Sequence, residues 1–461
     1  MKFRQLTVVL VSLLIINSMF SSVNLVKQTN AQTTTPDVYV GVDMGYATTV
    51  AGAESLIDQV SDYTNFFILG ASALTMNVSS LNETLQHAYD KGLYFMSFPP
   101  SLGISQALLN RSQAWIDYAK ANWGDHLKGF MYPYEDEPGG HTLDNNGQYR
   151  PNMNITKDTP LVDAEKQYIN SIWFQDVTRA KSLWNIPLFT SDYSLYWFDY
   201  LGGYDGLFAE FGWQKNTTFN VALCRGAATV QNKQWGVIIT YQYNSPPYME
   251  SGADLYKDLV LAYDNGAKYI TVLDTNVNWT AGLLTQEHFQ ALQQFWQYIH
   301  ETPRKSAQIS ERVAYELPQG YAYGFRGPSD NIWGVRPVDM MAYTISESVY
   351  IMLQQYGSKL DIIYNESKPE WNFGYSKTVL WNDPTAVASA WPSFWPGITQ
   401  NGTTPPTNQT PTSESPSSPD KAQIFMSEGY ICASVLAIAV ACAGLVFILR
   451  KRRIQPTAVH G

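Results

Sequence analysis

Three consecutive carboxylates, Glu135, Asp136 and Glu137, stand between a short apolar run and a Pro-Gly-Gly turn. Because proline cannot donate a hydrogen bond inside a sheet, the apolar run at residues 129–132 is expected to be a buried strand that ends at Pro133. The turn then holds the three acids at the carboxyl end of that strand. Two carboxyl groups held roughly 5 to 9.5 Å apart can hydrolyse a glycosidic bond, since one donates a proton and the other acts as nucleophile or base.

Polar side chains also end other short apolar runs along the chain: Asp43, Asp192, Tyr193, Glu210, Tyr241, Gln242 and Asp274. Of these, Glu210 lies between aromatic residues, and neighbours that exclude water raise the pKa of a carboxyl group. We therefore predict Glu137 and Glu210 as the catalytic pair, in which either residue can be the acid. Glu135, Asp136 and the other polar residues named above are predicted to bind the substrate, a role that suits tyrosines because they can hydrogen-bond sugar hydroxyls.

Eight short apolar runs between residues 37 and 303 alternate with amphipathic stretches such as residues 163–184, which indicates successive βα units. The expected strands are residues 38–42, 65–69, 93–97, 129–132, 187–190, 206–211, 236–241 and 269–273. This rhythm predicts a closed (β/α)8 TIM-type barrel, in which the carboxyl ends of the strands carry the active site. An open doubly wound sheet is the structural alternative, but no GxGxxG motif follows a strand to favour it.

Residues 304–395 are expected to form a small α/β accessory domain, with strands at 312–317, 360–364 and 378–381 and a helix at 340–356. A loop rich in glycine and aromatic residues, 321–334, contains Arg326. This loop either packs against the barrel or forms a wall of the substrate cleft.

The pattern resembles the superfamily of barrel-fold glycoside hydrolases, several families of which carry their general acid in an Asn-Glu-Pro tripeptide at the end of strand four. The matching residues here are Asp136, Glu137 and Pro138. This resemblance implies that Glu137 is the acid or acid/base and that Asp136 orients it. The adjacent Asp and Glu are also similar to those of the substrate-assisted hexosaminidases, in which the Asp steadies the substrate's acetamido group and the Glu donates the proton.

The second carboxylate departs from this pattern. In the Asn-Glu-Pro families the nucleophile ends strand seven, whereas the expected strand seven ends here in Tyr241, Gln242 and Tyr243. Glu210 on strand six is the best-placed candidate, and a pair on strands four and six resembles several α-glycosidase families, in which the strand-four acid is usually the nucleophile. The roles of Glu137 and Glu210 can therefore be exchanged.

Composition narrows the range of partners. The net charge is −10 and the sequence pI is near 5.1. Phosphate binding needs clustered Lys and Arg, so we expect no nucleic-acid partner. The sequence has no HExxH, CxxC pair or Walker motif, and we predict neither a cofactor nor a metal site. With 14 Trp and 30 Tyr, the chain has flat rings that suit sugar faces as well as cores.

Both ends of the chain carry targeting patterns. Lys2 and Arg4 precede an apolar run, which predicts a signal peptide over residues 1–31. The uncharged apolar run 431–449 is long enough for a transmembrane helix. Arginines and a lysine follow it directly, which predicts a cytoplasmic tail at 450–461 and an extracellular ectodomain on a single-pass membrane protein.

A segment rich in Pro, Ser and Thr at residues 401–420 predicts a disordered stalk that holds the ectodomain away from the membrane. Glycosylation sequons favour an extracellular glycoprotein. They occur at Asn77, Asn82, Asn110, Asn154, Asn216, Asn278, Asn365, Asn401 and Asn408.

The sequence thus favours a membrane-anchored extracellular glycoside hydrolase that acts on glycans through paired carboxylates. The alternative is a non-catalytic surface protein on the same barrel, which binds glycans or serves a structural role. The absence of an acid at the end of the expected strand seven keeps this alternative open.

Overall fold

The computed structural model describes residues 37–383 except 48, 102, 104, 134–137, 140–141, 144–152, 214–215, 276–281, 323–330, 338, 369–370 and 372. Glu135, Asp136 and Glu137 therefore lie outside the described residues, as do Arg326, the expected signal peptide, the stalk and residues 431–449. Within the described ranges, no helix is both long enough and apolar enough to cross a bilayer.

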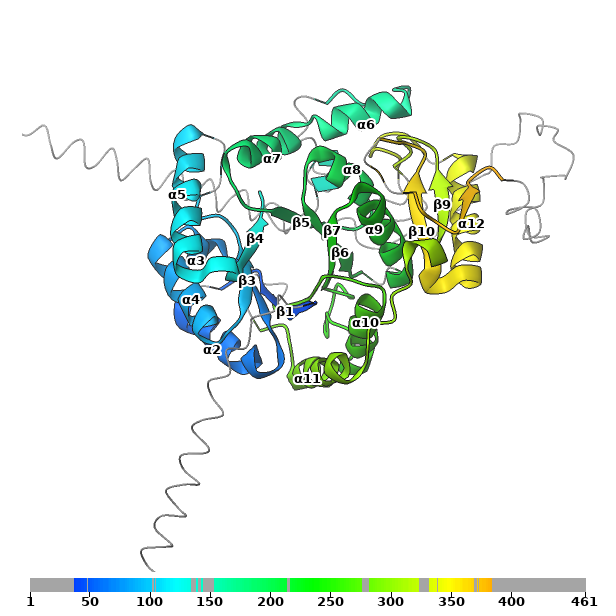
Figure 1. Ribbon diagram of the computed structural model, residues 1–461. Helices are drawn as coiled ribbons and strands as arrows, with labels where there is room; N and C mark the ends of the chain where they lie inside the picture. Colours follow the sequence, from blue (N-terminus) through cyan, green and yellow to red (C-terminus); the bar gives the residue numbers. More distant parts are fainter. Residues whose placement is uncertain are drawn as a thin grey trace, which may run out of the picture. The chain divides into compact units, whose positions relative to one another are not determined.

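Eight parallel strands form a closed barrel in the order in which they occur along the chain (Figure 1). The strands are β1 (Tyr39–Met44), β2 (Phe66–Leu69), β3 (Tyr94–Ser97), β4 (Leu127–Met131), β5 (Leu188–Asp192), β6 (Gly206–Phe211), β7 (Gln234–Ile239) and β8 (Tyr269–Leu273). The barrel closes because β8 pairs with β1, with Tyr269 opposite Tyr39. The predicted (β/α)8 barrel is confirmed, and the open-sheet alternative is wrong.

Helices surround the barrel (Figure 1). They are α2 (Val50–Val60), α3 (Ser72–Thr75), α4 (Val78–Asp90), α5 (Gln106–Trp123), α6 (Leu161–Ile169), α7 (Ile172–Leu183), α8 (Tyr196–Gly202), α9 (Thr217–Gln231), α10 (Gly252–Asp264) and α11 (Gln286–Glu301). Several begin at a side chain that accepts a hydrogen bond from a free N–H of the first turn, as Asn77 does for α4 and Ser251 for α10. These caps help to fix where each helix starts.

The barrel interior is filled by an apolar cluster distinct from the layer between strands and helices. Its buried members are Tyr39, Phe66, Ile68, Met96, Phe98, Met131, Phe189, Phe208, Ile238, Tyr269 and Leu273. Side chains alternate along a strand, so Asp43 shares the inner face of β1 with Tyr39, and Glu210 shares that of β6 with Phe208. Both carboxylates therefore lie inside the barrel, near the carboxyl ends of their strands.

A three-stranded parallel sheet follows the barrel, with strand order β10-β9-β11. It consists of β9 (Val313–Leu317), β10 (Leu360–Tyr364) and β11 (Lys377–Leu380), and α12 (Met340–Tyr356) connects the first two. The described residues thus contain the small α/β unit, with elements close to those expected from the sequence.

A buried ion cluster joins this sheet to the barrel. The Arg225 Nε of α9 donates to Asp361 Oδ1 of β10 at 2.7 Å, and Arg312 Nη1 donates to Asp361 Oδ2 at 2.7 Å. Arg225 also donates to the Leu360 carbonyl oxygen at 2.9 Å and to Asn265 Oδ1 at 2.6 Å. Because one carboxylate holds two guanidinium groups, the barrel and the sheet form a continuous packed unit.

Replacing Gly226 by Ala is expected to weaken this junction. A Cβ atom at Gly226 would lie 2.4 Å from the Ile362 carbonyl oxygen, and that oxygen belongs to the backbone of β10 and cannot rotate away. We expect the substitution to lower the free energy of unfolding by about 1–3 kcal/mol, the usual cost of overpacking. Urea unfolding measures this loss, and Gly52→Ala is the control, because Gly52 is also helical and the nearest atom to its added Cβ is a side-chain oxygen, Thr49 Oγ1, at 3.1 Å. A loss for Gly226→Ala no larger than that of the control would contradict the close contact.

Candidate active site

Glu210 lies at the carboxyl end of β6 with only 7% of its surface exposed. Ser191 of the neighbouring strand β5 donates from Oγ to Glu210 Oε1 at 2.6 Å. The Asn220 side chain of α9 donates to the Glu210 carbonyl oxygen at 2.9 Å, which fixes the backbone. Ser191 thus orients the carboxylate, and Asn220 fixes the backbone that carries it.

Asp43 lies at the carboxyl end of β1 and is completely buried. Neither of its carboxylate oxygens has a hydrogen-bond partner within the described part of the chain. Burial, and then the negative charge of Glu210, raise the pKa of Asp43 to about 8. A buried carboxyl group without partners is rare in proteins and costs stability, so Asp43 and Glu210 are the candidate site among the described residues.

Asp43 and Glu210 are two buried carboxyl groups that interact electrostatically. At neutral pH Asp43 retains its proton, because its ionised form would place a negative charge in a buried site beside Glu210. Two carboxyl groups whose surroundings separate their proton affinities are suited to acid and base roles. The interaction crosses the barrel, since β1 and β6 are not neighbours in the sheet.

The residues flanking the acidic triplet are anchored at the same end of the barrel. Tyr132 follows β4, and its N–H donates to the Phe189 carbonyl oxygen of β5 at 3.0 Å. The N–H of Gly139 lies 3.4 Å from Asp192 Oδ2 at the end of β5. Tyr132 and Gly139, which flank the triplet in the sequence, thus both contact β5, the strand that also provides Ser191.

Asp192 is engaged by the loop that follows β5. Its Oδ1 accepts hydrogen bonds from the backbone N–H groups of Tyr193 at 2.6 Å, Ser194 at 3.0 Å and Leu195 at 3.2 Å. Burial raises its pKa, and these backbone hydrogen bonds oppose the rise. Asp192 therefore holds the turn into α8, in addition to the substrate-binding role predicted for it.

Asp274 has a similar arrangement after β8. Its Oδ1 accepts from the Leu284 N–H at 2.8 Å and its Oδ2 from the Gly282 N–H at 3.2 Å. Burial raises its pKa against the effect of these bonds. Asp274 thus links the start of the segment between β8 and α11 to its end. In contrast, neither carboxylate oxygen of Asp43 accepts a hydrogen bond from a described residue.

The predicted tyrosines and glutamine lie beyond the ends of β5 and β7. Trp213 donates from its indole N–H to the Tyr193 hydroxyl, and the Tyr241 hydroxyl donates to the Thr275 carbonyl oxygen. The Trp213 and Tyr241 rings lie 5.9 Å apart. The side-chain amide of Gln242 donates to the Phe211 carbonyl oxygen at 3.2 Å. These contacts join the segments after β5, β6, β7 and β8.

Three aromatic side chains at this end of the barrel are solvent-exposed. Tyr46 follows β1 and is 37% exposed, Trp213 follows β6 and is 41% exposed, and Tyr243 follows β7 and is 38% exposed. Trp213 also has a φ of 56°, a left-handed conformation that is costly for a bulky residue and that often occurs at functional sites. The sequence reasoning did not select Tyr46, although an exposed aromatic directly after a barrel strand is the signal that would have identified it.

The sequence matches no protein-family model and none of the curated proteins with which it was compared. Three solved structures are similar over about three quarters of the chain. A GH5_18 protein from Streptomyces cattleya in complex with GlcNAc aligns at a TM-score of 0.50 and 11% identity, over 75% of this chain and 99% of that one.

The other two structures are β-galactosidases. That of the psychrophilic Marinomonas ef1 aligns at a TM-score of 0.48 and 11% identity, over 74% of this chain and 72% of its own. That of the Antarctic haloarchaeon Halorubrum lacusprofundi aligns at 0.47 and 10% identity, over 74% and 69%. At 11% identity, what the chain shares with the Streptomyces cattleya protein is the barrel fold, which is the fold that the resemblance to barrel glycoside hydrolases predicts.

Proposed function

We propose that the protein is a glycoside hydrolase whose site lies at the carboxyl end of the barrel. The observation that carries this proposal is the position of two buried carboxyl groups, Asp43 and Glu210, inside the end of the barrel at which active sites of this fold occur. A buried carboxyl group that lowers the stability of the fold and forms no hydrogen bond with the described residues is best explained by a role in catalysis.

In this proposal Glu137 and Glu210 are the two reacting carboxyl groups. Glu137 protonates the leaving oxygen, and Glu210, held by Ser191, attacks the sugar or activates water. Asp43 is completely buried and acts as a positioning residue, because burial and the charge of Glu210 raise its pKa and keep it neutral at pH 7. If the strand-four carboxylate is instead the nucleophile, the roles of Glu137 and Glu210 are exchanged.

The proposed substrate is a glycan whose sugar faces pack on exposed rings. Tyr46, Trp213 and Tyr243 provide such faces at the ends of three strands. The predicted polar residues Asp192, Tyr193, Tyr241, Gln242 and Asp274 form the floor and the supporting loops of the site. The barrel neighbour from Streptomyces cattleya was solved with GlcNAc, so amino sugars are the first class to test.

A glycan-hydrolysis screen of the full chain tests this function. Release of reducing sugar from β- and α-linked glycans, including GlcNAc-containing ones, is the expected result. Binding to a glycan array without cleavage of any bound glycan would instead establish the non-catalytic alternative. One observation favours that alternative: the segment after β7 carries Tyr241, Gln242 and Tyr243 in place of an acid.

We also propose that the protein acts at the cell surface, anchored by residues 431–449. The apolar and basic pattern of the C-terminal sequence supports this location. The exposure of the sequon asparagines adds support, since Asn77, Asn110, Asn154, Asn216 and Asn365 are all exposed and could accept a glycan without unfolding. Membrane fractionation followed by protease treatment of intact cells would test the topology, because an extracellular barrel is digested and a cytoplasmic one is protected.

A further inference from the structure

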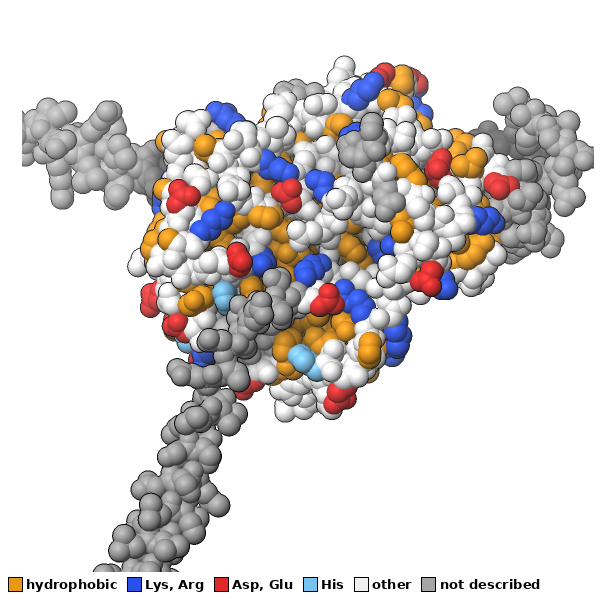
Figure 2. All heavy atoms as spheres, in the orientation of Figure 1, with side chains coloured by type: hydrophobic (Ala, Val, Ile, Leu, Met, Phe, Trp, Pro, Cys, Tyr) orange, Lys and Arg blue, Asp and Glu red, His pale blue; other side chains and the backbone are white. Residues whose placement is uncertain are grey.

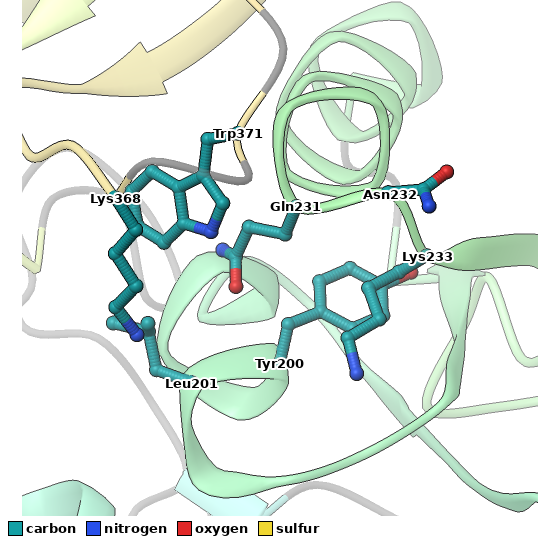
Figure 3. A pocket seen from close by; sticks show the side chains of 7 residues that line it. All are labelled: Tyr200, Leu201, Gln231, Asn232, Lys233, Lys368 and Trp371. Atoms are coloured by element: carbon teal, nitrogen blue, oxygen red, sulfur yellow. The ribbon is translucent and has the colours of Figure 1, made fainter.

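A cleft of about 380 Å³ lies at the amino end of the barrel strands, away from the candidate active site. It is lined by residues from the end of α8, from the turn between α9 and β7, and from the segment after β10 (Figure 3). The volume is within the range of roughly 300 to 1,000 Å³ that is typical of small-molecule sites. No residue assigned to the proposed hydrolysis lies in this cleft.

Two lysines, Lys233 and Lys368, lie on opposite sides of the cleft (Figure 3). Among the residues that the structure describes, neither forms an ion pair or a hydrogen bond to a side-chain acceptor. Burial, and then the charge of Lys181, lower the pKa of Lys233, and the negative charge of Asp205 opposes this more weakly. On the face shown in Figure 2, Lys and Arg side chains are interspersed with those of Asp and Glu.

Two carboxylates near the cleft already accept hydrogen bonds from other groups. Asp205 accepts from Lys181 Nζ at 2.7 Å and from the Leu188 N–H at 3.0 Å. Glu366 accepts from the Trp197 indole N–H at 3.2 Å. An anion in the cleft would therefore meet two ammonium groups with which no described carboxylate forms an ion pair, and in a chain of net charge −10 such a positive site is unusual.

The positions of these lysines are fixed by the backbone and by aromatic packing. Helix α9 ends at Asn232 in a left-handed conformation, and the Lys233 N–H then donates to the Ala228 carbonyl oxygen at 2.8 Å. The Lys368 ammonium group lies 5.2 Å from the centre of the Trp371 ring. Trp371 in turn contacts Trp197 of α8 edge-on, with 5.1 Å between the ring centres.

The cleft also has groups that suit a sugar ring. The Gln231 side-chain amide donates to the Trp197 carbonyl oxygen at 3.0 Å, which orients its own oxygen as an acceptor. Figure 3 shows Gln231 between Trp371 and Tyr200, with Lys368 on one side and Lys233 on the other. An aromatic face, an amide acceptor and two ammonium groups are together what a sugar bearing a carboxylate or sulfate requires.

We propose that this cleft is a second, non-catalytic site that binds one acidic saccharide unit. The carboxylate or sulfate of the sugar lies between Lys233 and Lys368, a sugar face packs on Trp371, and a hydroxyl group donates to the oxygen of Gln231. The site would hold an acidic glycan at the end of the barrel opposite Glu210. It does not depend on the proposed hydrolysis, because binding here involves none of the proposed catalytic groups.

Calorimetry of the full chain with D-glucuronic acid, glucose and inorganic sulfate tests the proposal. The titrations are made in the Glu210→Gln background, so that hydrolysis does not contribute. Glucuronate is expected to bind and glucose to bind at least about tenfold more weakly, since a hydrogen bond to a charged group contributes about 1.5–3 kcal/mol. Lys233→Gln and Lys368→Gln are each expected to weaken glucuronate binding by about tenfold, whereas Lys305→Gln, which removes an exposed lysine elsewhere, has no effect.

The aromatic part of the site is tested separately with Trp371→Phe, which preserves the packing on Trp197, and with Trp371→Ala. Both are expected to weaken glucuronate binding more than sulfate binding, and thermal unfolding confirms that each variant is folded. Equal affinity for glucuronate and glucose would overturn the proposal, as would unchanged affinity in the two lysine variants. Equal affinity for glucuronate and sulfate would overturn its saccharide part and leave a site for inorganic anions.

Discussion

Replacing Asp43 by Asn is expected to raise the free energy of unfolding at pH 7 by on the order of 4 kcal/mol. Asn is neutral and nearly the same shape as a protonated Asp, so the packing inside the barrel is retained. What the substitution removes is the requirement to keep a proton on a buried carboxyl group. A gain of stability on removing an acid is the signature of a functional group that the fold does not need.

The pH dependence of this gain follows from the two pKa values. In the unfolded chain Asp43 titrates near its usual value of 3.8, and in the folded chain near 8. Between these values the folded state binds more protons than the unfolded state, so the stability of the parent chain falls as pH rises through this window. The Asn variant lacks this contribution. The two proteins should therefore be equally stable below about pH 4 and diverge progressively up to about pH 8.

Urea unfolding of both proteins at pH 4, 5.5, 7 and 8.5 measures this divergence. Asp158→Asn serves as the control, because Asp158 is exposed and pairs only with the neighbouring Lys157. The control should follow the parent chain at every pH. A constant difference between Asp43→Asn and the parent across this range would contradict a raised pKa for Asp43.

Replacing Asp361 by Asn is expected to lower the free energy of unfolding by about 3–5 kcal/mol. The variant keeps the size of the side chain but leaves Arg225 and Arg312, whose side chains are 4% and 11% exposed, without their shared anion. The Tyr375 hydroxyl also loses a carboxylate acceptor at 3.0 Å. Because the cluster joins the small sheet to α9, much of the loss should appear as early unfolding of that sheet.

Denaturation monitored by tryptophan fluorescence measures this loss, and hydrogen exchange in β9 and β10 locates it. Asp264→Asn is the matched control, since its contact with Lys305 at 3.5 Å lies at the surface and such pairs contribute about 0–1 kcal/mol. A change for Asp361→Asn as small as that of the control would show that the ion cluster does not hold the two parts together.

Much of the fold could be predicted because each barrel strand is a short apolar run followed by turn residues. The expected strand at 206–211 coincides with β6, and the expected helix at 340–356 coincides with α12. The sequence predicts a single helix at 163–184, but the structure has two helices, α6 and α7, which are separated at Asn170 and Ser171. The Asn170 side chain donates to the Lys166 carbonyl oxygen, a local bond that competes with helix continuation.

The candidate site was only partly predictable, because strand ends show which residues share a rim and not which of them meet. Asp43, Asp192 and Asp274 look equivalent in the sequence, each ending an apolar run. In the structure, backbone N–H groups of the following loops surround Asp192 and Asp274, whereas Asp43 faces Glu210 across the barrel. That difference depends on barrel closure and loop conformation, which are set by contacts distant in the sequence.

The most direct test of the proposed function is the hydrolysis rate of Glu210→Gln and Glu137→Gln on the best substrate from the glycan screen. Each substitution keeps the shape of the side chain and removes its ability to exchange a proton. We expect each to lower kcat by about 10²- to 10⁴-fold without changing the thermal unfolding of the chain. Asp90→Asn, at the exposed end of α4, should retain the parent rate. Hydrolysis at the parent rate in the folded Glu210→Gln variant would contradict the central role of the barrel carboxylates.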